Sequence, residues 1–154
     1  MDSRKETDGS TTSYGLWRYG NDFYRAAVTL NENHNEQGFM PFYSTIGQSI
    51  ELSLKAFLLA KDIDIKTLSH EYRHNLNKLI SKSRELNLES IAKLNNAHIA
   101  AIDLMSDEYL KKKYHYIKTG RIMLPENNLI IQAAHVLTIN LETYCKENTK
   151  WEYA

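Results

Sequence analysis

The hydrophobic residues of this chain recur every three or four positions over long stretches, the spacing of one face of an α-helix. Between Gln48 and Thr119 there is neither glycine nor proline, so the middle of the chain lacks the frequent turns that strands require. The pattern therefore predicts an all-α fold, a bundle of about five helices with no sheet. The expected helices cover about residues 15–32, 41–61, 67–86, 89–106 and 125–147.

The second expected helix is the most hydrophobic of the five. It carries two apolar stripes, which together cover most of its surface. One stripe consists of Ile46, Ile50, Leu54 and Phe57, and the other of Leu52, Ala56 and Leu59. A helix that is apolar on most sides lies in the middle of a bundle, so we expect this helix to be central.

The length of 154 residues corresponds to about one domain, which is enough to bury a core without disulfides. Residues 1–13 are rich in Ser, Thr, Asp and Glu and predict a disordered or loosely attached tail. We expect residues 14–150 to form the single domain. No internal repeat or sustained heptad is present, so a solenoid or a coiled coil is not indicated.

Charge and cysteine content exclude several classes of protein. The chain has 19 Lys and Arg against 19 Asp and Glu, so it is not a globally basic nucleic-acid binder, and any such role needs a local patch. The single cysteine, Cys145, allows neither an intrachain disulfide nor a cysteine metal cluster. There is no apolar run of bilayer length and no secretory signal pattern. We therefore expect a cytoplasmic protein without membrane association.

One segment, Tyr109–Leu124, is locally basic and contains no acidic residue. Its cations are Lys111, Lys112, Lys113, Lys118 and Arg121, and Tyr114, His115 and Tyr116 lie among them. Basic residues interleaved with aromatic ones can bind phosphates and stack bases. The segment is thus a candidate site for phosphate, nucleotide or RNA. The alternatives are a solvated loop whose tyrosines pack on the domain, and a protein interface.

A second pattern carries a family resemblance. The run Ile50-Glu51-Leu52-Ser53-Leu54-Lys55-Ala56 is followed about twenty residues later by His74-Asn75-Leu76. This resembles the HEPN family, in which an apolar helix with Glu-Leu-x-Leu-Lys-Ala precedes a helix opened by His-Asp-Leu. The stretch from Tyr114 to Arg121 also resembles uncharacterised HEPN-like bacterial proteins. The resemblance covers roughly half of the chain, and it departs from the family at Arg73, where glycine is frequent, and at Asn75.

The resemblance implies an up-and-down helical bundle that forms a homodimer. It also implies association with RNA, a nucleotide, or a toxin–antitoxin or defence partner such as a nucleotidyltransferase or an antitoxin. Catalytic HEPN proteins need an Arg, four to six residues, and then a His, and none of the six histidines here meets that spacing. We therefore expect a module without the standard nuclease activity. Two alternatives stay open: a divergent ribonuclease or nucleotide-directed enzyme using His115 as proton carrier, and an adaptor that binds only protein.

Glu51 interrupts an otherwise apolar helix, and a buried carboxylate there needs a partner. Lys55 is four residues later, in the order favoured for a helical ion pair, and Arg73 or His74 could reach Glu51 from the next helix. The contact would stabilise the fold or line a site. His70 and His74 have a metal-compatible spacing, but no Glu or Cys completes a recognisable motif, so we expect neither metal nor cofactor.

Overall fold

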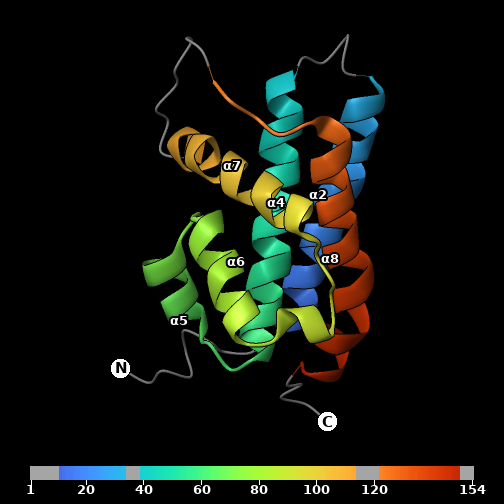
Figure 1. Ribbon diagram of the computed structural model, residues 1–154. Coiled ribbons are helices and arrows are strands. Elements are labelled where there is room, and N and C mark those ends of the chain that lie inside the picture. Colours follow the sequence, from blue (N-terminus) through green and yellow to red (C-terminus); the bar gives the residue numbers. More distant parts are fainter. Residues whose placement is uncertain (1–10, 34–38, 114–121, 150–154) are drawn as a thin grey trace.

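The computed structural model describes residues 11–33, 39–113 and 122–149. Every regular element within these ranges is helical, which confirms the predicted all-α class (Figure 1). The elements in chain order are α2 (Ser13–Glu32), α4 (Phe39–Ala60), α5 (Ile65–Thr67), the π-helical turn η1 (Leu68–Tyr72), α6 (Leu76–Glu85), the 3-10 turn η2 (Leu88–Ser90), α7 (Asn96–Lys113) and α8 (Asn127–Glu147).

α2 begins slightly earlier than the sequence predicted. Thr12 caps the helix, and its side chain accepts a hydrogen bond from the backbone N–H of Gly15. Ser13 is buried and donates its hydroxyl to the carbonyl of Ala56 at 2.7 Å. The assignment of residues 1–13 to a loose tail was therefore wrong for Thr12 and Ser13, because both have specific partners. Residues 1–10 lie outside the described ranges.

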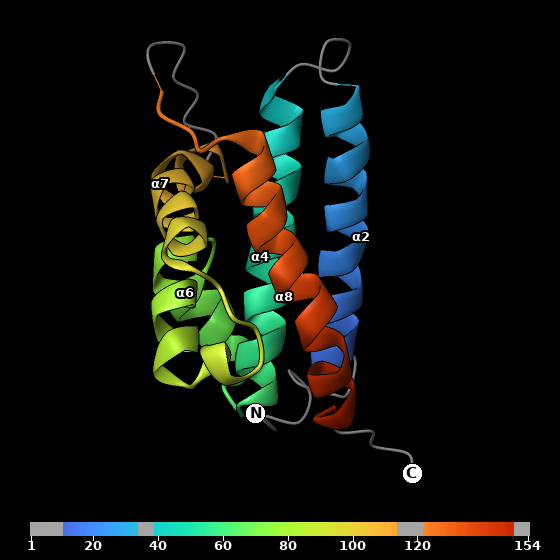
Figure 2. The same cartoon turned by 45° about the vertical axis from the view of Figure 1, so that its right-hand side comes forward.

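α2 and α4 run antiparallel and form the most extensive helix pair (Figure 2). Their axes approach closely at Gly20, where an added Cβ would lie 2.9 Å from the hydroxyl of Ser53 and 3.2 Å from the carbonyl oxygen of Ser49. Ser49 donates its own hydroxyl to the carbonyl of Gly20 at 2.7 Å. Small residues on both helices thus set the spacing of this pair.

α4 is the central helix, as its two apolar stripes predicted. It packs against α2, α6, α7 and α8, and the stripe that consists of Ile46, Ile50, Leu54 and Phe57 is completely buried. α8 covers the α2–α4 pair, and the indole N–H of Trp17 on α2 donates to the carbonyl of Thr138 on α8 at 2.7 Å. None of the described helices combines the length and the hydrophobicity that a bilayer-spanning helix needs.

The third expected helix, about 67–86, is interrupted. The chain forms α5 and η1, then a tight turn in which the N–H of Asn75 donates to the carbonyl of Tyr72 at 2.9 Å, and only then α6. The side chain of Asn75 accepts from the N–H of Lys78 and caps α6. An asparagine side chain that bonds the backbone in this way ends one helix and begins another, which hydrophobic periodicity alone does not reveal.

The fourth expected helix, about 89–106, is displaced toward the C-terminus. Asn87 adopts a left-handed conformation before η2, and the side chain of Asn95 accepts from the N–H of His98 at 2.8 Å at the start of α7. α7 then continues to Lys113, beyond the expected end. It also crosses α4 obliquely, whereas α2, α4 and α8 stand roughly upright in the same view, so the bundle departs here from a simple up-and-down arrangement (Figure 1).

Candidate functional site

Glu51, in the middle of α4, is the most heavily hydrogen-bonded buried acid in the described part of the chain. Glu51 is only 4% exposed to solvent. Lys55 donates to Oε2 at 2.9 Å, and the hydroxyl of Tyr109 donates to Oε1 at 2.7 Å. Nδ1 of His74 lies 3.0 Å from Oε1 and 3.1 Å from Oε2. We call these four residues the Glu51 cluster; it joins α4, α7 and the turn before α6.

The charge of Glu51 is stabilised by these partners. Burial raises the pKa of Glu51, but the charge of Lys55 and hydrogen bonds from Tyr109, Lys55 and His74 outweigh burial, so the pKa lies below its ordinary value. Burial and the adjacent carboxylate raise the pKa of Tyr109 far above its usual range. Glu51 is therefore an acceptor and Tyr109 a donor throughout the neutral pH range.

Gly47 gives Tyr109 access to Glu51. A Cβ at Gly47 would overlap the ring of Tyr109, so the ring lies directly on the backbone of α4 one turn before Glu51. Tyr109 was not predicted as a partner of Glu51, because the sequence pattern placed it at the start of a connection between helices. The one signal in the sequence was Gly47, four residues before Glu51, because a glycine on a helix leaves room for an aromatic ring against the backbone.

His74 is held toward Glu51 by a strained turn. Its predecessor Arg73 has φ 47° and ψ −120°, the conformation of the first central residue in a type II′ turn, where glycine is preferred. Arg73 directs Nε to the carbonyl of His70 at 3.3 Å. The contact that the sequence predicted between Glu51 and the start of the next helix is thus present through His74, whose side chain remains 39% exposed.

The described lysines of the basic segment are helical, which corrects their assignment to a loop. Lys111, Lys112 and Lys113 form the last turn of α7, where cations interact favourably with the helix dipole. Lys111 pairs with Asp107 at 2.8 Å, a partner outside the segment that the sequence showed to be free of acids. Tyr114, His115, Tyr116, Lys118 and Arg121 lie outside the described residues.

The other two lysines fix the end of α7 to α4. The ammonium of Lys112 donates to the carbonyl of Met40 at 3.3 Å, and that of Lys113 donates to Oε1 of Gln48 at 2.6 Å. Lys113 also lies 5.4 Å from the centre of the Tyr109 ring. Burial, with the neighbouring charge of Lys113, lowers the pKa of Lys112. The basic segment therefore starts from a fixed position beside the Glu51 cluster.

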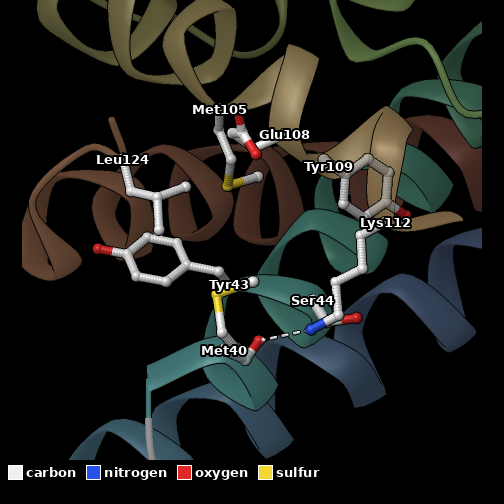
Figure 3. Close-up of a pocket in the computed structure, with 8 residues that line it drawn as sticks. All are labelled: Met40, Tyr43, Ser44, Met105, Glu108, Tyr109, Lys112 and Leu124. Atoms are coloured by element: carbon white, nitrogen blue, oxygen red, sulfur yellow. Dashed lines mark hydrogen bonds between the residues drawn. The ribbon is translucent and has the colours of Figure 1, made fainter. Parts of the chain in front are cut away.

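A narrow, mostly apolar pocket is bordered by the side chain of Lys112 (Figure 3). The space within it that a water-sized molecule can occupy is about 10 Å³, which is about the least that holds one water molecule. Its lining comes from α4, α7 and the non-helical segment before α8: Met40, Tyr43, Ser44, Met105, Glu108, Tyr109, Lys112 and Leu124. The pocket as it stands accommodates no ligand of ordinary size.

His98 belongs to the core, and the described residues contain no cluster of metal ligands. His98 is buried and exchanges hydrogen bonds with Asn95, so it is part of the start of α7. Among the described residues, no three His, Cys, Asp or Glu side chains are grouped as metal ligands would be. His70 and His74 therefore have no third described ligand.

Comparison with known proteins gives no relative: no family model matches the chain, and no curated protein or solved structure matches it.

Proposed function

We propose that this protein is a HEPN-like helical binding module without HEPN nuclease activity, and that its ligand carries phosphate groups, with single-stranded RNA as the first candidate. The module acts as a homodimer, alone or with a nucleotidyltransferase-like or antitoxin-like partner. The observation that carries the proposal is the run of five cations without an acid between Tyr109 and Leu124, which begins on the fixed last turn of α7. The resemblance at Glu51 and His74 supports the family part, since these two residues are in direct contact.

The local partners of the lysines are compatible with phosphate binding. The pairs of Lys111 with Asp107 at 2.8 Å and with Glu108 at 3.7 Å are partly exposed, and surface pairs stabilise a protein by at most about 1 kcal/mol. The contact of Lys112 with a neutral carbonyl at 3.3 Å is long. A polyphosphate chain offers these cations a stronger interaction through charge-assisted hydrogen bonds and release of counterions.

A binding role fits the Glu51 cluster better than catalysis does. General base catalysis works best with a pKa near the working pH, whereas the pKa of Glu51 is lowered and its two oxygens already accept three donors. The spacing of Arg and His that HEPN nucleases use is missing from the whole sequence. A divergent ribonuclease that uses His115 is the second candidate, and the same experiment distinguishes it.

The test is a titration of labelled single-stranded RNA at low and moderate salt. One variant replaces Lys111, Lys112, Lys113 and Arg121 with serine. The matched control removes the same charge elsewhere by replacing Lys66, Lys82, Lys93 and Lys146 with serine. We expect the first variant to bind at least about tenfold more weakly, the control to bind like the parent, and parental affinity to fall steeply with salt.

Integrity of the RNA after incubation separates the candidates. Intact RNA with salt-sensitive binding supports the binding module, and cleavage by the parent supports the enzyme. If the parent binds no better than the segment variant, the phosphate proposal fails and a protein-only adaptor becomes the better description. Sedimentation measures the assembly, since a monomer has a mass of 17.9 kDa.

A further inference from the structure

One side of α2 carries an apolar stripe that is only partly covered by the described part of the chain. Its members recur at spacings of three and four residues, and they are Leu16, Tyr19, Phe23, Ala26 and Leu30. Leu16 and Leu30 pack against the core at the two ends of the stripe. Between them Tyr19 is 65% exposed, Ala26 is exposed, and Phe23 is half-buried without packing against the described core cluster. The middle of the stripe therefore presents apolar surface to solvent.

The stripe points away from the helix that covers the other flank of α2. On that flank the indole of Trp17 bonds to the carbonyl of Thr138 on α8. The hydroxyl of Tyr24 lies 3.1 Å from Nδ1 of His135, which is also on α8. α2 itself stands at the edge of the bundle and packs chiefly against α4 and α8 (Figure 2). The described helices thus leave the middle of the stripe without a cover.

α4 extends the stripe into a face of two helices. Leu52 is half-buried and, like Phe23, does not pack against the described core cluster. It lies on the side of α4 opposite to the stripe that fills the core. Gly20 and Ser53 mark the close approach of α2 to α4. Tyr19 and Leu52 each precede one of these two residues, so they lie at the same level of the helix pair. We call the stripe on α2 together with Leu52 the α2–α4 face.

The charges beside this face suit a second copy of the same chain. Arg18, Asp22 and Arg25 are exposed along α2, and none of them pairs with another described residue. Their signs alternate. When two α2 helices pack antiparallel about a two-fold axis, Asp22 of each copy meets an arginine of the other, so both copies form an ion pair at once. The net charge of zero adds no repulsion between the copies.

The size of the face also suits a dimer of this chain. α2 has 20 residues and α4 has 22, so each helix is about 30 Å long. Two helices whose axes are about 9 Å apart present a face roughly 20 Å wide. The product is about 600 Å² before the relief of the side chains is added, close to the roughly 800 Å² that each partner buries in a stable complex. A short peptide would cover only part of it.

We infer, on the basis of the homodimer in the proposed function, that the α2–α4 face is the interface of that dimer and that its occupant is the same face of a second copy. Two α2–α4 pairs then form a four-helix bundle between the subunits. Lys113 at the end of α7 is bonded to Gln48, one turn before Leu52 on α4. The end of α7 therefore borders this face, and the dimer brings two basic segments to the rim of one interface.

The experiment measures the dissociation constant of the dimer by sedimentation equilibrium between about 1 and 100 μM. Tyr19→Asp and Leu52→Gln change the face. Ile139→Asp is the matched control, because Ile139 is 62% exposed but lies on α8. We expect Tyr19→Asp to raise the constant at least about tenfold, since interface tyrosines are frequent hot spots and each dimer loses two. Leu52→Gln should raise it less, and Ile139→Asp should leave it unchanged. Circular dichroism checks that each variant is folded.

A charge exchange distinguishes a second copy from any other occupant. Asp22→Arg alone places three cations beside the face and should weaken the dimer. Arg18→Asp and Arg25→Asp, added to Asp22→Arg, invert all three signs and keep the alternation, so the triple variant should dimerise like the parent. Failure of the triple variant to recover would overturn the antiparallel pairing of α2 with its copy.

The assembly of the parent separates this assignment from the proposed function. If the parent is a dimer and Tyr19→Asp dissociates no more readily than Ile139→Asp, the dimer uses another surface: the assignment is wrong and the proposed homodimer stands. A parent that stays monomeric up to about 100 μM overturns the assignment and the homodimer together. The phosphate part of the proposed function is then decided independently by the RNA titration.

Discussion

A helical glycine allows a close contact at two places in this bundle, and the two contacts differ in kind. At Gly20 the missing side chain lets α2 approach α4, and the contact is made by the small residues Ser49 and Ser53. At Gly47 it lets the ring of Tyr109 reach along α4 to the carboxylate of Glu51. The first contact brings two helices together by close packing, and the second brings three elements to one buried charge. The second should therefore depend much more on individual side chains.

The largest expected effect is that of Glu51→Ala. It leaves the donors of Lys55, His74 and Tyr109 without their acceptor, and removal of one partner from a buried charged network costs about 3–5 kcal/mol of unfolding free energy. Denaturant unfolding monitored by circular dichroism measures the loss. A loss below about 1 kcal/mol would show that the cluster is not a structural connection.

The same residue makes stability depend on pH. Because the pKa of Glu51 is lower in the folded protein than its ordinary value, its contribution is complete above the unfolded-state value, about 4.3, and disappears as pH falls through the folded value. The difference in unfolding free energy between the parent and Glu51→Gln should therefore shrink on acidification from neutral pH. A difference that stays constant from neutral pH into the acid range would contradict the ionised state of Glu51.

Gly47→Ala should rank next and should exceed Gly20→Ala. The new Cβ at position 47 overlaps a ring whose hydroxyl is fixed at Glu51, so we expect a loss of about 2–3 kcal/mol, as in an overpacked core. At position 20 the hydroxyl of Ser53 can rotate away, and the two backbone atoms of α4 at 3.2 Å need to shift by only a few tenths of an ångström, so the loss should be about 1 kcal/mol. Adding Tyr109→Ala should remove the penalty at position 47 but not at position 20.

Arg73→Gly should be more stable than Arg73→Ala by about 1 kcal/mol, because glycine adopts the positive φ of this turn without strain. Arg73→Ala is the matched control, since it removes the same side chain but retains the Cβ that causes the strain. Thermal unfolding should place the glycine variant above the alanine variant. The reverse order would show that the turn is not strained in solution.

The smallest effects are expected at the α2–α4 contact. The hydroxyl of Ser53 is buried and has no hydrogen-bond partner among the described residues, so Ser53→Ala should be neutral or stabilise the protein by up to about 1 kcal/mol. Ser49→Ala loses the bond to Gly20 and should destabilise by about 1 kcal/mol. Equal changes in unfolding free energy for the two variants would show that the hydrogen bond of Ser49 does not distinguish it from Ser53.

The sequence predicted the elements whose apolar faces are long and regular. α2, α4 and α8 lie close to the expected ranges, and the central position of α4 followed from its two stripes. The boundaries around α6 and α7 were wrong, because side-chain bonds of Asn75 and Asn95 decide them locally. Periodicity reports which residues face the core and is insensitive to such caps.

The candidate site was only partly predictable. A glutamate in an apolar helix indicated a buried partner, and the resemblance indicated where in the chain to look, so the contact with His74 was anticipated. Tyr109 is 58 residues from Glu51, and its role depends on the oblique crossing of α7 over α4. The direction in which one helix crosses another is set by packing of both surfaces and is not contained in the periodicity of either.

The first and last described helices are joined at their outer ends. The N–H of Tyr14 donates to the hydroxyl of Thr149 at 2.9 Å, and that hydroxyl donates in turn to the carbonyl of Cys145 at 2.7 Å. The path of the described helices therefore almost closes into a ring, so the order in which the chain visits them is exchangeable in principle. A circularly permuted gene, with a short linker between the ends of α8 and α2 and new ends opened near Asn87, would encode the same helices in a different order.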